Sequence, residues 1–128
     1  MKYLVASSCA LLCMVFSSIG MAAEIPYDQT EFDAVRTAGR PVAVVFHADW
    51  CPTCRAQAPV LKSLLSAPEF KELTVFVANF DTAKRLERSL AVTKQSTIVV
   101  FKGGREAARS TGDTQPAPLA ALLHHAID

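Results

Sequence analysis

The stretch Val42–Leu65, VAVVFHADWCPTCRAQAPVLKSLL, decides the fold. It begins within a continuous apolar run, Pro41–Ala48, which is typical of a β-strand buried on both faces. From Pro52 onward the apolar residues recur at helical spacing, and proline suits the first turn of a helix. The stretch therefore predicts a buried strand followed by a helix, with Cys51 and Cys54 at the start of the helix.

Further strands and helices alternate on both sides of this stretch. Leu73–Phe80 and Thr97–Lys102 are apolar runs typical of buried strands. The helix between the first two strands predicts that they are parallel and joined by a right-handed crossover. The dipeptide Gly103-Gly104 predicts a tight hairpin turn after the third strand. The other predicted elements are an extended lead-in at Glu24–Gln29, a helix to Ala38 capped by Asp28 or Thr30, a helix Ala83–Leu90 capped by Asp81-Thr82, an edge strand Arg105–Thr111 and a last helix made by Pro116, Pro118 and Leu119–Ile127. We expect an α/β fold in which helices flank a central mixed sheet of about four strands.

Residues 1–23 have the pattern of a secretory signal peptide. Lys2 precedes an almost uncharged stretch, Tyr3–Ala23, whose apolar core has the length of an h-region and is followed by small residues. We expect cleavage after Ala22 or Ala23, which leaves residues 24–128 as a single domain. An uncleaved membrane anchor is the alternative, because about 20 apolar residues can span a bilayer. Both interpretations place the domain in the periplasm.

The charge of the chain is nearly balanced, with 13 Lys and Arg against 12 Asp and Glu and a net charge of +1. Nucleic-acid-binding domains and polybasic membrane patches need a clear positive excess, which this composition lacks. The length of 128 residues fits one domain. We therefore expect no nucleic-acid partner, and we expect a monomer.

Removal of the signal peptide leaves Cys51 and Cys54 as the only cysteines. A disulfide across so short a loop removes little entropy from the unfolded chain, so chemistry explains the pair better than stabilisation does. Cys51 precedes a helix whose unpaired N–H groups and dipole favour a thiolate. We expect Cys51 to be a solvent-accessible nucleophile, and Cys54, one turn further along, to resolve the mixed disulfide that Cys51 forms.

Two other uses of a CxxC pair fit the sequence less well. Zinc would need two more ligands, and after residue 23 the chain offers only His47, His124 and His125 as further Cys or His candidates. Haem attachment requires a histidine after the second cysteine, where Arg55 stands. We expect neither a metal ion nor another cofactor, so the redox group is the Cys51–Cys54 disulfide.

The segment Phe46–Leu61 resembles the active-site segment of thioredoxin-family proteins. It contains the sequence WCPTC, a basic residue after the second cysteine, and Ala58-Pro59 shortly beyond. The order of elements from Pro41 to Ile127 is similar to the thioredoxin fold without its extra first strand. The resemblance implies a thioredoxin-like fold and a thiol-disulfide oxidoreductase whose partners are protein thiols and disulfides.

Two buried charged residues that this resemblance leads us to expect are replaced. Cytosolic thioredoxins carry an aspartate six residues before the first cysteine, as a proton acceptor for the resolving thiol, and a lysine on the next strand. Val45 and Val77 stand at these positions. Proton transfer at Cys54 must then use water or another group. Asp49 and Asp81 are candidates, although a solvated loop residue and a helix cap explain them as well.

The resemblance also implies a substrate groove, formed by Trp50, Pro52, Thr53, Ser96 and Thr97. The family usually has a cis-proline immediately before the residue that corresponds to Thr97, and this chain has Ser96 there. A cis bond before any other residue costs about 2.5–4 kcal/mol, so we expect trans peptide bonds at Ser96. The Ser96 hydroxyl could hydrogen-bond a thiolate, or Ser96 could be an ordinary residue at the start of a strand.

Some sequence features bear on the direction of electron transfer. The run ADWC is similar to that in the exported domain of transmembrane thiol reductases, and an exported reductant needs electrons from such a membrane partner. The dipeptide Pro52-Thr53 matches neither the Gly-Pro of cytosolic thioredoxins nor the Pro-His of the strong periplasmic oxidase. We expect a periplasmic protein-disulfide reductase. The open alternatives are a disulfide oxidase or isomerase and a copper-binding assembly factor for cytochrome or oxidase maturation.

Overall fold

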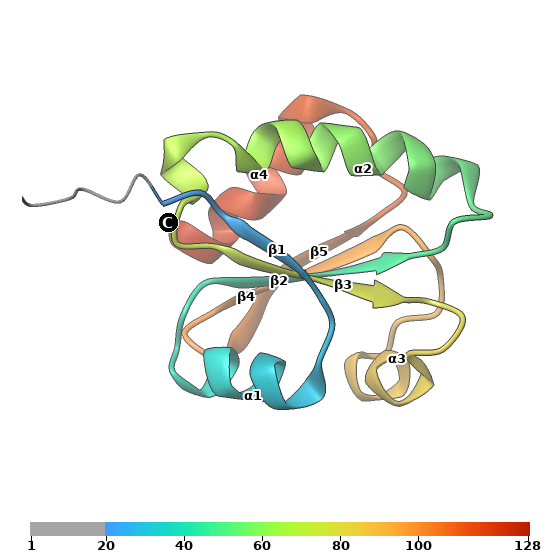
Figure 1. Ribbon diagram of the computed structural model, residues 1–128, viewed down its shortest axis with the longest axis horizontal. Coiled ribbons are helices and arrows are strands. Elements are labelled where there is room, and N and C mark those ends of the chain that lie inside the picture. Colours follow the sequence, from blue (N-terminus) through green and yellow to red (C-terminus); the bar gives the residue numbers. More distant parts are fainter. Residues whose placement is uncertain (1–19) are drawn as a thin grey trace, which may run out of the picture.

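The computed structural model describes residues 20–128. Its elements are β1 (Ala23–Pro26), α1 (Gln29–Thr37), β2 (Val42–His47), α2 (Pro52–Leu65), the short 3-10 helix η1 (Pro68–Phe70), β3 (Thr74–Asn79), α3 (Lys84–Leu90), β4 (Thr97–Lys102), β5 (Arg105–Thr111) and α4 (Pro116–Ile127). Helices α2 and α4 cover one face of the sheet, and α1 and α3 cover the other (Figure 1). The predicted α/β fold is confirmed. The predicted signal peptide lies outside the described residues, apart from positions 20–23.

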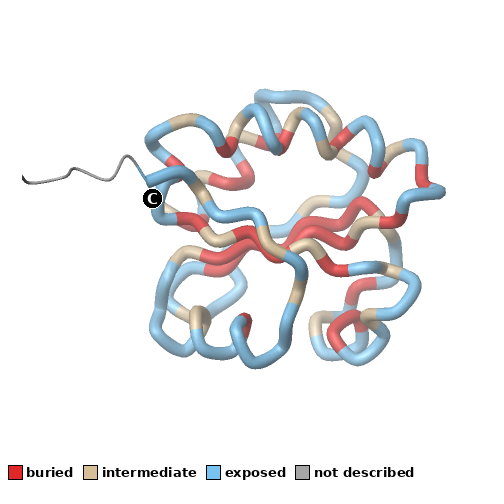
Figure 2. The backbone as a smooth tube through the Cα atoms, in the orientation of Figure 1, coloured by how far each residue is buried: buried red, intermediate tan, exposed pale blue. Residues whose placement is uncertain are grey.

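The five strands form one sheet in the order β1-β3-β2-β4-β5. β2 pairs parallel with β3 and antiparallel with β4, so the sheet is mixed, as predicted. Neighbouring side chains of β2 point to opposite faces. Val45 packs in the core under α2 and α4, whereas Val44 and Phe46 pack in the core with Phe32 of α1. This burial on both faces, visible along the central strands in Figure 2, explains why β2 is apolar throughout.

The sheet has five strands where about four were expected, and the expectation that the extra first strand is missing is wrong. Strand β1 (Ala23–Pro26) begins one residue before the predicted lead-in Glu24–Gln29 and pairs parallel with β3 in the register Ala23 to Thr74 and Pro26 to Val77. Three of the four residues of β1 are exposed, and Pro26 lacks an N–H group. Both features suit an edge strand, and both hide the alternation of apolar residues by which strands are recognised.

The predicted caps of α1 and α3 have different outcomes. Asp28 caps α1, because its carboxylate accepts a hydrogen bond from the N–H of Glu31 at 2.9 Å. The cap predicted at Asp81-Thr82 is wrong: α3 begins after Ala83, which makes no side-chain capping bond. The Asp81 carboxylate is directed instead at the indole of Trp50.

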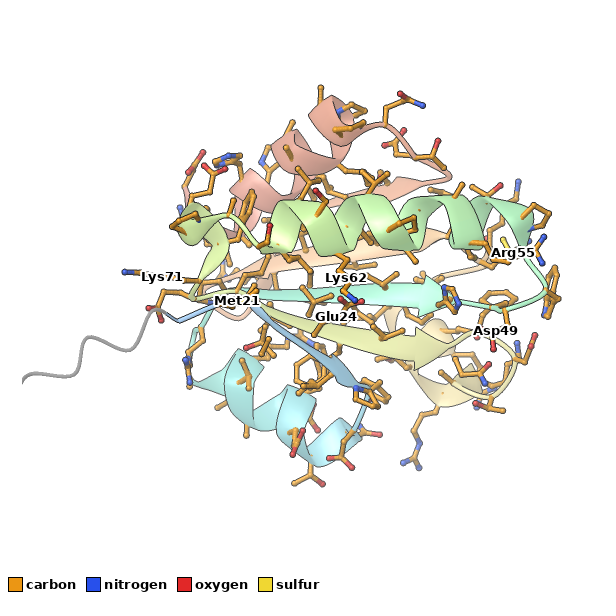
Figure 3. All side chains as sticks on the ribbon, turned by 45° about the horizontal axis from the view of Figure 1, so that its top comes forward. Met21, Glu24, Asp49, Arg55, Lys62 and Lys71 are labelled. Carbon is orange, nitrogen blue, oxygen red and sulfur yellow. The ribbon has the colours of Figure 1, made fainter. Side chains whose placement is uncertain are left out.

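The start of α2 lies at one end of the molecule's long axis, and both ends of the described chain lie at the other. Asp49 and Arg55, which flank the cysteine pair, lie at one end of the molecule, and Met21 lies at the other (Figure 3). The chain ends at Asp128 on the same side as Met21 (Figure 1). Within residues 20–128, no helix combines the length and the apolar character that crossing a membrane requires.

Candidate active site

Cys51 is the N-cap residue of α2, and its sulfur takes the place of a capping oxygen. The backbone at Cys51 is extended, with φ −86° and ψ 115°, and Pro52 occupies the first helical position. The Cys51 Sγ accepts a hydrogen bond from the N–H of Cys54 at 3.2 Å. The end of β2 therefore delivers Cys51 to the unpaired N–H groups of the helix, where a negative charge is favoured.

Both sulfurs lie beneath the surface rather than on it. Cys51 and Cys54 are 2% and 1% exposed, and they pack with Ala48 and the half-buried ring of Phe80. Both cysteines are free thiols. The predicted solvent accessibility of Cys51 is therefore wrong for this structure, because its sulfur turns inward to the N–H of Cys54. Phe80 packs both against this cysteine cluster and against the core on the α1 side of the sheet.

Ser96 contacts both sulfurs from the loop before β4. Its Oγ lies 3.0 Å from the Cys54 Sγ and 3.4 Å from the Cys51 Sγ. Ser96 is buried, and the described residues contain no cis peptide bond, so the expected trans geometry holds at this position. The Ser96 backbone has φ +61°, in the left-handed region that residues with a side chain rarely adopt. Of the two interpretations of Ser96, the structure supports a hydrogen bond to the thiols.

Gln57 joins the α2 helix to the Ser96 loop, and sequence reasoning missed it. Its side-chain amide is buried, with 1% of the residue exposed. The Nε2 donates to the Ser96 carbonyl at 3.3 Å and to the Asp113 carbonyl at 2.8 Å. Gln57 follows Cys54 by three positions, so it lies on the same buried face of the helix. A polar side chain on that face is the signal in the sequence that could have identified it.

The two thiols differ in acidity. Burial raises the pKa of the Cys51 thiol, but hydrogen bonds from Cys54, from the Ser96 hydroxyl and from the N–H groups of Cys54 and Thr53 outweigh it, and the pKa falls below the ordinary cysteine value. Burial and the hydrogen bond to Cys51 raise the pKa of Cys54. The thiolate therefore forms first on Cys51.

Trp50 lies at the rim of the site and is 57% exposed. Its indole N–H donates to the Asp81 carboxylate at 2.9 Å. Asp49 is fully exposed and pairs with the His47 ring at 2.9 Å. A cavity of about 200 Å³, lined by these four residues and by Ala48, Val77, Ala78 and Asn79, opens beside the cysteines. Neither Asp49 nor Asp81 hydrogen-bonds a sulfur among the described residues.

Of the other predicted groove residues, two lie next to the cysteines and one does not. Pro52 is exposed and Thr53 is half-buried in the first turn of α2, next to the cysteines. Thr97 is buried, and its hydroxyl donates to the Lys94 carbonyl at 2.7 Å and contacts the Thr111 hydroxyl at 2.9 Å. The Thr97 side chain thus belongs to the β4–β5 pairing and makes no hydrogen bond with either sulfur.

Comparison with known proteins agrees with this geometry. The profile of the family described as Thioredoxin matches residues 24–125. The chain belongs to the thioredoxin family. A putative thioredoxin-5 of Dictyostelium discoideum is 33% identical over 93 residues, which are 72% of this chain and 88% of that protein.

Two solved structures resemble the chain over most of its length. The crystal structure of Trxlp from Edwardsiella tarda has a TM-score of 0.77 at 38% identity, covering 79% of this chain and 98% of that chain. A mutant thioredoxin from Halobacterium salinarum has a TM-score of 0.70 at 25% identity, covering 84% of this chain and 92% of that chain. This protein is therefore a thioredoxin-family disulfide oxidoreductase with a CxxC pair.

The structure also locates the two residues that replace the charges of cytosolic thioredoxins. Val45 is 5% exposed and packs in the core under α2. Val77 is half-buried and lines the cavity beside Trp50. Thioredoxin-family proteins generally carry out disulfide exchange with the dithiol alone. Among residues 20–128, no group of three or more His, Cys, Asp and Glu side chains is arranged to hold a metal ion.

Proposed function

We propose that this protein is an exported reductase of protein disulfides that acts in the periplasm. The observation that carries the proposal is the position of Cys51 at the N-cap of α2, where its sulfur accepts the N–H of Cys54 at 3.2 Å. In agreement with this geometry, the pKa of Cys51 is lowered and that of Cys54 is raised. The thiolate is the attacking species in disulfide exchange. Cys51 is thus the nucleophile, and Cys54 keeps its proton until the second step.

The reaction has two steps with Cys51 at the centre of both. The Cys51 thiolate attacks one sulfur of a substrate disulfide, the S–S bond of the substrate breaks, and the other substrate sulfur leaves as a thiolate. Cys54 then attacks the Cys51 sulfur of the mixed disulfide and releases the second substrate sulfur. Two electrons pass to the substrate, and the protein is left with a Cys51–Cys54 disulfide.

The family members it resembles support the direction of electron transfer. The related protein of Dictyostelium discoideum is named a putative thioredoxin, and thioredoxins are reductants at about −270 mV. The exposed indole of Trp50 offers an apolar face at the rim, where a polypeptide substrate can approach Cys51. We therefore assign reduction, rather than oxidation or isomerisation, to this site.

The predicted signal peptide supports the compartment. Export separates the protein from cytosolic donors, so the oxidised pair must regain two electrons from a donor that reaches the periplasm. We assign this role to a transmembrane thiol reductase, because the ADWC run that precedes Pro52 is similar to the exported domain of such proteins. The protein is proposed to act as a monomer on protein substrates.

The deciding experiment is the equilibrium potential of the dithiol against glutathione. A potential near about −270 mV, with reduction of insulin disulfides, supports the proposal. A potential near about −120 mV identifies an oxidase instead. Tight stoichiometric binding of Cu(I) to the reduced protein, with negligible insulin reduction, identifies the copper-binding alternative.

Two variants separate the roles of the cysteines. Cys51→Ser removes the nucleophile and is expected to abolish insulin reduction. Cys54→Ser is expected to leave the attack intact and to trap substrates as mixed disulfides on Cys51, which mass spectrometry of a periplasmic extract then identifies. Full activity of Cys51→Ser contradicts the assignment of the nucleophile.

A further inference from the structure

The second step of the reaction requires a group that takes the proton of Cys54. Cys54 must lose a proton before it attacks, yet its pKa is raised by burial. The position of the aspartate in cytosolic thioredoxins holds Val45, whose side chain cannot accept a proton. Among the described residues, the side chain that hydrogen-bonds both sulfurs is that of Ser96, at 3.0 and 3.4 Å.

We propose that the Ser96 hydroxyl relays the proton of Cys54 to the departing substrate sulfur, and that Gln57 holds Ser96 in position for this transfer. The inference rests on the proposed dithiol reaction of Cys51 and Cys54. Ser96 is then a catalytic residue, since it touches both reacting sulfurs, and Gln57 is a positioning residue.

The relay balances the second step. As the Cys54 sulfur forms its bond to the Cys51 sulfur, the bond between Cys51 and the substrate sulfur breaks and its electron pair goes to the substrate. The Ser96 oxygen accepts the proton of Cys54 while its own proton passes to the substrate sulfur. The substrate leaves as a neutral thiol and the serine is regenerated. The substrate sulfur is attached about 2 Å from the Cys51 sulfur, which Ser96 already contacts.

The backbone of Ser96 is held from three sides in a conformation that it would not adopt alone. Its N–H donates to the Phe46 carbonyl at 2.8 Å, and its carbonyl accepts from the N–H of Gly112 at 3.1 Å. Gln57 donates to the same carbonyl and ties it to Asp113. With φ at +61°, the Ser96 side chain points to the sulfurs, and loss of one of these bonds frees the loop to relax.

The charged groups around the site are engaged elsewhere. From the turn after β2, Asp49 pairs with His47, and from the loop after β3, Asp81 accepts the indole N–H of Trp50. Asp113 reaches the site through its backbone carbonyl, which Gln57 occupies. A carboxylate route through water in the neighbouring cavity is the competing pathway, and Asp49→Asn tests it.

The leaving group of the second step provides the test. Reduced protein is mixed with glutathione disulfide or with an aromatic disulfide that releases a coloured thiolate of low pKa. Acid quenching and mass spectrometry then follow formation and loss of the mixed disulfide separately. An alkyl thiol needs a proton to leave well, whereas the aromatic thiolate does not. A relay therefore matters for the first reagent and little for the second.

Ser96→Gly removes the hydroxyl and keeps the left-handed backbone, because glycine adopts positive φ without strain. It is expected to slow resolution of the glutathione mixed disulfide by about 100-fold, the lower end of what general acid-base catalysis contributes. Formation of that mixed disulfide and resolution of the aromatic one are expected to change far less. If Ser96→Gly resolves the glutathione adduct as fast as the wild type, or if Asp49→Asn alone slows it, the relay is overturned.

Gln57→Met keeps the length of the side chain and removes both donors. We expect slower resolution of the glutathione adduct, and we expect Gln57→Met combined with Ser96→Gly to be no slower than Ser96→Gly alone, because both changes act through one hydroxyl. Leu61→Val, a buried change on the same helix away from Ser96, is the control for loss of stability. The role of Gln57 is overturned if the double variant resolves the adduct more slowly than Ser96→Gly alone, or if Leu61→Val slows resolution as much as Gln57→Met does. Failure of the wild type to form a mixed disulfide refutes the proposed function itself.

Discussion

Ser96 keeps a backbone conformation that most residues avoid, and it does so beside the reactive sulfurs. The left-handed conformation costs a residue with a side chain about 1–2 kcal/mol. Hydrogen bonds to Phe46, Gly112 and Gln57 hold it there, so the surrounding structure supplies the free energy. Strain of this kind persists where a side chain must be held at one place, and here that place is between Cys51 and Cys54.

This strain is measurable in the stability of two variants. Ser96→Ala keeps a β-carbon in the left-handed conformation, whereas Ser96→Gly does not. After allowance for the greater flexibility of glycine in the unfolded chain, Ser96→Ala is expected to be less stable than Ser96→Gly by about 1 kcal/mol. Urea denaturation of the two reduced proteins at one pH provides the comparison. An alanine variant as stable as the glycine variant would show that the loop relaxes.

The opposite pKa shifts of the two thiols predict an order of alkylation. Because the pKa of Cys51 is lowered, its thiolate forms at a pH below the ordinary cysteine value of about 8.5, whereas Cys54 requires a higher pH. Alkylation by iodoacetamide across a pH series, read by peptide mass spectrometry, should therefore show a midpoint for Cys51 below that of Cys54. The reverse order would contradict the assignment of nucleophile and resolving thiol.

The same shifts fix the sign of two contributions to the stability of the reduced protein. The folded pKa of Cys51 is depressed, so its contribution is present above the unfolded value and is lost as the pH falls through the folded pKa. The folded pKa of Cys54 is raised, so its contribution is present below the unfolded value and is lost as the pH rises through the folded pKa. Around pH 8.5 the stability contribution of Cys51 thus grows as the pH rises, whereas that of Cys54 declines.

At the residue scale, the local pattern of strand and helix located the cysteines, whereas Ser96 was expected only from the family resemblance and Gln57 was missed. A helix start after an apolar strand places Cys51 and Cys54 without knowledge of any other element. Ser96 is separated from them by more than 40 positions, and its left-handed backbone results from contacts with three different parts of the chain. Gln57 was missed because its hydrogen bonds reach the Ser96 and Asp113 carbonyls, and such pairings leave no periodic pattern.

At the scale of elements, the β4–β5 hairpin is fixed to α1 by one arginine. The Arg36 Nε donates to the Gly104 carbonyl at 2.9 Å, and its guanidinium lies 4.7 Å from the centre of the Phe101 ring. Gly103 and Gly104 both have positive φ, at +57° and +81°, as a two-residue hairpin turn requires. The turn predicted from the two glycines is thus confirmed, and α1 packs closely against it.

The two glycines of this turn are a matched pair for substitution. A β-carbon on Gly103 would meet open space, whereas one on Gly104 would lie 3.2 Å from the Arg36 carbonyl oxygen. Both alanine variants pay for positive φ, about 1 kcal/mol, and Gly104→Ala is expected to lose roughly twice as much because of the contact. Thermal unfolding gives the order. The dithiol potential should not change in either variant, and equal losses would show that the contact relaxes.

The strands and helices that the sequence defined well are those with regular burial. β2, β3 and β4 are apolar on both faces, and all three were predicted within a residue or two at each end. β1 escaped prediction because an edge strand of four residues pairs on one side only. Its existence depends on the exposed edge of β3, which no local pattern in Ala23–Pro26 indicates.

At the scale of the whole molecule, β1 bears on which of the two cleavage sites expected for the proposed signal peptide suits the fold. The Ala23 N–H donates to the Leu73 carbonyl at 3.2 Å, and Ala22 packs against the core beneath α2 and α4. Cleavage after Ala22 leaves β1 complete, whereas cleavage after Ala23 removes its first residue. We therefore expect the exported protein to begin at Ala23. Intact mass measurement of protein from the periplasm tests this, and a mature protein that begins at Glu24 would contradict it.

The position of the two chain ends has a practical consequence. Met21 and Asp128 lie at the end of the molecule opposite the first turn of α2, whose 14 residues extend for about 21 Å along the long axis (Figure 1, Figure 3). A flexible linker joined to either end therefore attaches to the face that takes no part in chemistry. Protein immobilised through such a linker on a bead or an electrode presents the exposed Trp50 and the first turn of α2 outward, so the attachment itself leaves the reactive end open to large substrates.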